Sequence, residues 1–169
     1  MRSVFISYRR DDTQGEANHL ADDLKAALPG DRVFLDVTAI AIGRDFRRAI
    51  EDAVGTCDVL IVMIGRQWLD ARDEAGTRRL DDPQDFIRLE MAHALRRDIP
   101  VVPVLVQGAA MPRADQLPAD LEPLAWRNAF ELRHARWKAD VAALLAGLRV
   151  VFAGTTGETA TPGAAGGGG

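Results

Sequence analysis

Residues 58–64, with the sequence DVLIVMI, decide the fold. After the first aspartate this run is apolar at every position, whereas a strand with one face in water alternates apolar and polar residues. A continuous run rich in Val and Ile is typical of a strand buried on both faces of a parallel sheet. Three other runs have the same character and a fifth is weaker. They lie at residues 3–8, 32–36 and 101–106, with the weaker one at 127–132.

Helical patterns separate these runs. The first has apolar residues spaced by three or four over residues 20–28, and Pro29-Gly30 ends it. Further helices are expected at 46–54, 84–97 and 135–147. Strands that alternate with helices in this way form right-handed crossovers and a parallel sheet covered on both sides. We therefore predict an α/β fold, a flavodoxin-like doubly wound sheet of five parallel strands in the order 2-1-3-4-5 with helices on both faces.

Two stretches do not fit this alternation of strands and helices. Residues 107–124 hold three prolines and little periodicity, which predicts a long surface connection with at most a short helix. Residues 150–169 are rich in Gly, Ala and Thr, and they are expected to form a disordered tail or linker. The folded domain is therefore predicted to span residues 1–149.

Composition excludes several classes of protein. The chain has 169 residues, of which 47% are hydrophobic, so it is long enough for one domain with a sizeable core. Its net charge is −4 and its cations are scattered, which argues against nucleic acid as a direct partner. The first apolar run begins after three residues and no run approaches 18, so we expect a cytoplasmic protein without a membrane segment. Cys57 is the single cysteine, which excludes an internal disulfide and a thiolate metal cage, and we expect it to be buried.

The carboxyl ends of the predicted strands suggest a ligand site, because open parallel sheets bind ligands at that edge. The first strand leads into Ser7, Tyr8, Arg9 and Arg10, the second into Asp36, and the third into Trp68. Two cations, a carboxylate and two aromatic rings at one edge would suit an anionic ligand that carries a flat ring. The alternative for the two arginines is an ordinary solvated turn.

Four stretches in register resemble the successive motifs of a TIR (Toll/interleukin-1 receptor) domain over residues 1–147. They are SVFISYRRDD, RVFLDVTAIAIGRDFRRAIEDAV, CDVLIVMIGRQWL and DFIRLEMAHALRRDIPVVPVLV. TIR domains are either scaffolds or enzymes that cleave NAD+, and the enzymes carry a glutamate on the third helix. Glu90 stands at that position here, and Phe86 replaces the Trp that is common four residues earlier. His93 lies on the same stripe of the helix and is expected at the surface.

The resemblance implies a set of site residues. Glu90 would be catalytic, and NAD+ would be the substrate of a reaction that needs no cofactor and no metal. The alternative for Glu90 is an exposed carboxylate paired with Arg88 or Arg97. The residues expected to contact the substrate are Ser7, Tyr8, Arg9, Arg10, Asp36, Ile42, Gly43, Trp68 and Phe86.

The resemblance also implies partners. The loop at residues 37–45 matches the one through which TIR domains contact a neighbouring protomer, although it lacks the acidic and proline residues frequent there. Self-association is therefore expected, with a fused or separate sensor domain as a further partner. The first functional reading is an NAD+ glycohydrolase that acts in bacterial antiphage immunity and gives ADP-ribose or its cyclic form. The second is a non-catalytic scaffold, and a receiver domain is set aside because the third strand ends in Met63-Ile64-Gly65 without a phosphoacceptor aspartate.

Overall fold

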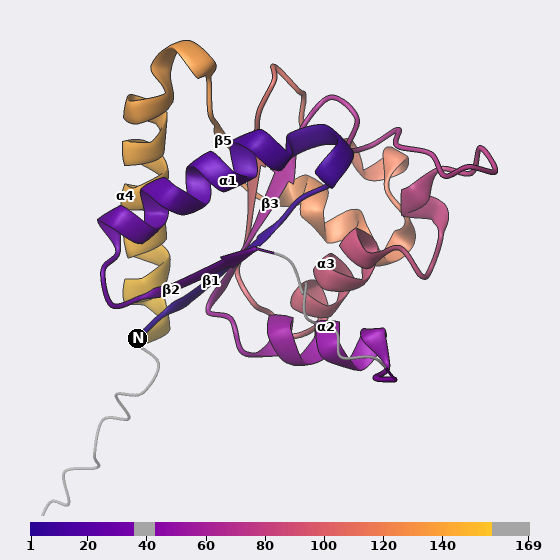
Figure 1. Cartoon of the computed structure of the whole chain (residues 1–169), viewed down its shortest axis with the longest axis horizontal. Coiled ribbons are helices and arrows are strands. Elements are labelled where there is room, and N and C mark those ends of the chain that lie inside the picture. Colours follow the sequence, from indigo (N-terminus) through magenta and orange to yellow (C-terminus); the bar gives the residue numbers. More distant parts are fainter. Residues whose placement is uncertain (36–42, 157–169) are drawn as a thin grey trace, which may run out of the picture.

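A five-stranded parallel sheet forms the centre of the molecule (Figure 1). The structure is a computed structural model, and it describes residues 1–35 and 43–156. The strand order is β2-β1-β3-β4-β5, which confirms the predicted topology. The strands are β1 (Ser3–Ser7), β2 (Arg32–Leu35), β3 (Val59–Ile64), β4 (Val101–Leu105) and β5 (Phe130–Glu131).

Within the described residues, four α-helices cover the sheet. Two of them lie on each face (Figure 1). On one face lie α1 (Arg10–Ala27) and α4 (Trp137–Thr156), and on the other α2 (Phe46–Gly55) and α3 (Phe86–Arg96). Each pair buries its own apolar cluster against the sheet. Because successive side chains of a strand point to opposite faces, Val4 and Ile6 join the α1/α4 cluster while Phe5 joins the α2/α3 cluster. All six residues of β3 are buried, as the continuous run predicts.

Three short 3₁₀ segments among the described residues complete the α2/α3 face: η1 (Arg79–Asp81), η2 (Ala114–Gln116) and η3 (Ala119–Trp126). A further one, η4 (His134–Arg136), leads into α4. The predicted surface connection at 107–124 is therefore more ordered than expected. Leu117, Leu121 and Leu124 are buried in the same cluster as α3. Pro123 lies inside η3, where its ring would clash with the carbonyl four residues earlier in a regular α-helix.

The last helix extends past the predicted domain boundary at residue 149. It continues to Thr156, and Phe152 is 8% exposed. The Arg2 guanidinium lies over the Phe152 ring, 5.1 Å from its centroid. Residues 150–156 are therefore helical and not part of a tail, because Phe152 gives this stretch an apolar contact that its composition does not reveal. Among the residues that the structure describes, no helix combines the length and the apolar character needed to cross a membrane.

Candidate functional site

The order of the strands reverses between β1 and β3, which places the switch point of the sheet at the carboxyl ends of these two strands. Successive side chains of β1 and of the residues that follow it point to opposite faces of the sheet. The predicted site residues are therefore divided between the two faces. Tyr8 belongs to the α1/α4 core and is 6% exposed. Its ring is therefore part of the hydrophobic core and offers no open face on which a substrate could stack.

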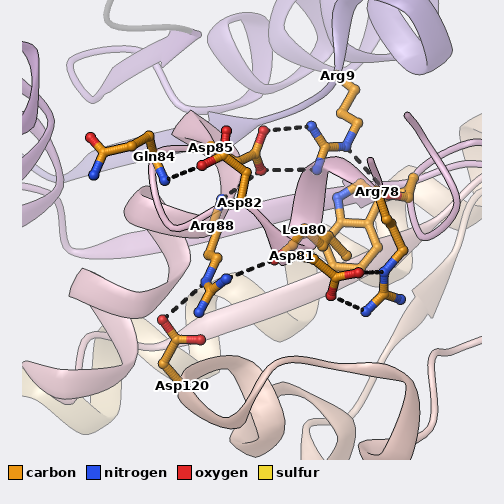
Figure 2. Close-up of polar contacts among 10 residues, drawn as sticks. Arg9, Arg78, Leu80, Asp81, Asp82, Gln84, Asp85, Arg88 and Asp120 are labelled. Atoms are coloured by element: carbon orange, nitrogen blue, oxygen red, sulfur yellow. Dashed lines mark hydrogen bonds and ion pairs between the residues drawn. The ribbon is translucent and has the colours of Figure 1, made fainter. Parts of the chain in front are cut away.

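Arg9 is a buried cation with several protein partners. The residue is 4% exposed, and its Nη1 and Nη2 donate to Asp85 Oδ1 and Oδ2, both at 3.0 Å (Figure 2). Its Nε donates to the backbone carbonyl of Trp68 at 3.3 Å. The guanidinium thus joins the end of β1, the loop after β3 and the start of α3. The next residue, Arg10, begins α1 and is exposed.

Two other predicted contact residues are buried as well. Trp68 is fully buried, and its Nε1–H has no hydrogen-bond partner among the described residues. Ser7 is 1% exposed, and within the described part of the chain its Oγ likewise lacks a partner. The structure therefore does not support stacking of a substrate on Trp68, since three residues of loop carry the indole back into the α2/α3 core.

The first turn of α1 packs closely on the end of β3. Gln67 N donates to Asp12 Oδ1 at 3.2 Å, and burial raises the pKa of the Asp12 carboxyl. Gly65 makes the approach possible: a Cβ at this position would lie 2.5 Å from Asp12 Oδ2 and 2.6 Å from Thr13 Cγ2. The loop that carries Trp68 is thus held against α1.

Gly65→Ala is expected to destabilise the fold by about 1–3 kcal/mol, because the added methyl group overlaps both Asp12 and Thr13. The matched control is Gly15→Ala in the interior of α1, where a Cβ meets nothing within 4 Å. This control should stabilise the fold by up to about 1 kcal/mol through helix propensity. Urea unfolding of the two variants measures the difference, and equal free energies of unfolding would contradict the close packing.

The first turns of α3 carry the predicted catalytic residue. Asp85 is the N-cap, and its Oδ2 accepts from Arg88 N at 3.1 Å. Phe86 follows, 48% exposed, and its ring packs against that of Phe46 at the start of α2 with centroids 5.0 Å apart. Glu90 lies one turn further along and is only 4% exposed.

Glu90 is therefore not an exposed surface carboxylate, which was the alternative that the sequence left open. The two cations considered as its partners have other neighbours. Arg88 donates to Asp120 at 3.2 Å and to the Leu80 carbonyl at 3.1 Å (Figure 2), and Arg97 lies beside Gly55 of α2. A buried carboxylate on a helix whose other buried residues, apart from His93, are apolar is uncommon, and it marks Glu90 as the candidate catalytic group.

His93 is buried, and its predicted position at the surface is wrong. It lies beside Gly55 on α2, where a Cβ would make an ordinary van der Waals contact of 3.7 Å with His93 Nε2. Burial lowers the pKa of the His93 imidazole. Arg97 and Arg96 lower this pKa further, and Glu51 and Asp52 on α2 partly oppose them.

Because the pKa of His93 is lower in the folded state than in the unfolded one, the unfolded chain binds the additional proton first on acidification. Stability should therefore fall as the pH drops below about 6.5, the ordinary pKa of histidine. The variant His93→Gln should show a flatter dependence between pH 7 and 5. Urea unfolding at several pH values compares the two proteins, and parallel curves would contradict the prediction.

The remaining predicted contacts lie at the loop before α2. Gly43 has a φ of +85°, which favours glycine, and it lines a surface hollow of about 460 Å³ together with Arg44, Asp45 and Arg48. Asp36 and Ile42 lie outside the described residues, so their predicted roles stay predictions. Within the described ranges, no group of three or more His, Cys, Asp or Glu side chains could hold a metal ion.

Comparison with protein families decides the assignment. A model of the TIR domain family matches residues 4–145. The chain belongs to the TIR domain family. This agrees with the strand order, with the positions of β1 to α3 and with the resemblance of the sequence motifs. No curated protein matches the sequence of this TIR domain.

Solved structures agree on the fold. The TIR domains in the structure of the activated Roq1 resistosome, which directly recognises the pathogen effector XopQ, are similar with a TM-score of 0.62 at 15% identity, covering 88% of this chain and 99% of that one. A prokaryotic SEFIR domain is similar with a TM-score of 0.58 at 19% identity, covering 89% of this chain and 92% of the other. At these identities the likeness extends to the fold alone.

Sequence reasoning missed Asp85, which unites the cap of α3 with the partner of Arg9. A signal was present, because Asp before an apolar helical pattern is a typical N-cap. Its pairing with Arg9, 76 residues earlier, depends on the tertiary structure and has no local signature.

Proposed function

We propose that this TIR domain is an NAD+ glycohydrolase with Glu90 as its catalytic carboxylate. The observation that carries the proposal is the burial of Glu90, which is 4% exposed one turn from the half-exposed ring of Phe86. Burying a carboxylate costs free energy that a purely structural glutamate at the surface would avoid. Groups held at such a cost are concentrated in functional sites.

One carboxylate suffices for this reaction. Glycoside hydrolysis usually needs a second carboxyl group, which protonates the leaving oxygen. In NAD+ the leaving group is a positively charged pyridinium, and it departs as neutral nicotinamide when its nitrogen takes the electron pair of the C1′–N bond. No general acid is required. The carboxylate of Glu90 holds the ribose hydroxyls and stabilises the positive charge that develops at C1′.

The acceptor decides the product. When the oxygen of water forms the new bond to C1′, one of its protons is released and ADP-ribose results. When a nitrogen of the adenine in the same molecule forms that bond, the product is a cyclic ADP-ribose. Of the predicted substrate contacts, Phe86, Arg10 and Gly43 lie at the surface, and Ser7, Asp36 and Ile42 stay candidates from the sequence.

Activity is proposed to require self-association of TIR domains, in a bacterial antiphage response in the cytoplasm. The resistosome neighbour supports this only by analogy, since its TIR domains belong to an activated assembly. The alternative function is a non-catalytic scaffold. The exposed aromatic rings of Phe86 and Trp126, which are 48% and 77% exposed, favour a contact surface and fit either function.

Nicotinamide release tests the proposal. The full chain is incubated with NAD+ at high protein concentration, with and without a crowding agent, and nicotinamide is quantified by chromatography. We expect release that rises more steeply than linearly with protein concentration. A chain that releases none under any clustering condition is a scaffold.

A further inference from the structure

We infer that Arg9 and Asp85 form a positioning pair that fixes the start of α3, and with it Glu90, against the end of β1. This assignment rests on the proposed function and changes the role that the sequence suggested for Arg9. Arg9 would act on the reaction through Asp85 and not through contact with NAD+.

The contact geometry is that of an internal clamp. Arg9 Nη1 donates to Asp85 Oδ1 and Arg9 Nη2 donates to Asp85 Oδ2, each at 3.0 Å. This bidentate arrangement fixes the orientation of the two side chains as well as their distance. The side chains are 3% and 11% exposed, so water competes little for them. The third donor of Arg9, Nε, is engaged by the Trp68 carbonyl. A guanidinium used in this way has few donors left for a phosphate.

Asp85 transmits this restraint to the helix. The oxygen Oδ2 that accepts from Arg9 Nη2 also accepts from Arg88 N, and the Asp85 carbonyl accepts from Leu89 N at 2.9 Å. Glu90 follows Leu89 directly. Glu90 stands five positions after Asp85, which is about 7.5 Å along the helix axis. A change in the direction of this first turn therefore moves the carboxylate.

A second restraint holds the same turn from the opposite side. Arg88 bonds to Asp120 on η3 and to the Leu80 carbonyl on η1, as Figure 2 shows. The start of α3 is thus fixed between β1 and the 3₁₀ segments. Such fixing matters for catalysis, since a misplacement of about 1 Å can cost on the order of 100-fold in rate.

A double-mutant cycle tests the inference. The proteins are wild type, Arg9→Gln, Asp85→Asn and the double variant, with kcat and KM for NAD+ measured under clustering conditions. Each single variant should lose about 10- to 100-fold in kcat. The kcat of the double variant should be no lower than that of the slower single variant, because either substitution alone already breaks the Arg9–Asp85 pair. KM should stay within about threefold of the wild-type value, because neither substitution removes a contact with NAD+.

The matched control is Asp140→Asn, which breaks another Arg–Asp pair, that of Arg133 with Asp140 at the start of α4, on the opposite face of the sheet from α3. It should leave kcat unchanged. A rise in KM for Arg9→Gln that Asp85→Asn does not reproduce would overturn the inference and return Arg9 to substrate binding. Additive losses in kcat would overturn it as well.

Hydrogen exchange gives a readout that does not depend on NAD+ cleavage. In Arg9→Gln and Asp85→Asn, the amides of residues 87–91 should lose protection while those of α1 keep theirs. Unchanged exchange over α3 overturns the positioning pair even in an active enzyme. Loss of protection in a chain that releases no nicotinamide would instead mean that the clamp exists and the proposed function is wrong.

Discussion

Glu90→Gln is expected to lower the rate of nicotinamide release from NAD+ by at least about 100-fold, or roughly 3 kcal/mol of transition-state stabilisation. The substitution keeps the size of a side chain that is 4% exposed but removes its negative charge. A neutral amide can still hold the ribose hydroxyls, yet it does not stabilise the positive charge at C1′. The loss should therefore appear in kcat more than in KM. Chromatographic quantification of nicotinamide, with both proteins clustered to the same degree, measures it.

The control for this prediction is Glu122→Gln, which removes an exposed carboxylate from η3 and should leave the rate unchanged. Thermal unfolding of Glu90→Gln establishes that the fold persists, so that a lower rate reports the loss of the charge and not unfolding. A Glu90→Gln protein that retains wild-type turnover would remove Glu90 from the mechanism. If Glu90→Gln and Glu122→Gln both release nicotinamide as fast as wild type, a different group is catalytic.

The fold was predictable because its signal is local. The apolar run at 58–64 has no polar side, and only a parallel sheet covered on both faces accommodates several such strands. The end of the domain was harder, because Phe152 lies within a Gly- and Ala-rich stretch and its contact with Arg2 comes from the other end of the chain.

The sequence predicts where the candidate site lies in the fold but not the surroundings of its residues. The carboxyl edge of β1 and β3 follows from topology, and Glu90 from the TIR motif. Successive side chains after β1 point to opposite faces of the sheet, and this decides which of them lie near the candidate site. Tyr8 lies on the α1/α4 face, whereas Arg9 lies on the α2/α3 face. Burial was the second difficulty. Arg9 and Trp68 look exposed in a polar stretch of sequence, and their partners come from Asp85 and from the α2/α3 core, far along the chain.

Trp68→Ala is expected to destabilise the protein by about 3–5 kcal/mol, because it removes the largest kind of side chain from a fully buried position. The residue belongs to the α2/α3 cluster together with Leu80 and Met91, so the cavity would open beside the start of α3. Urea unfolding measures the loss. Part of the indole's burial is unfavourable, since no described residue accepts from its Nε1–H.

Trp68→Phe separates packing from any contact with substrate. It keeps an aromatic ring in the core and removes the N–H, so we expect a loss of about 1–2 kcal/mol, well below that of alanine. The backbone carbonyl that accepts from Arg9 is retained in both variants. KM for NAD+ should therefore stay close to wild type in Trp68→Phe. A large rise in KM with little change in stability would mean that the indole does reach the substrate, and that this loop leaves the core when NAD+ binds.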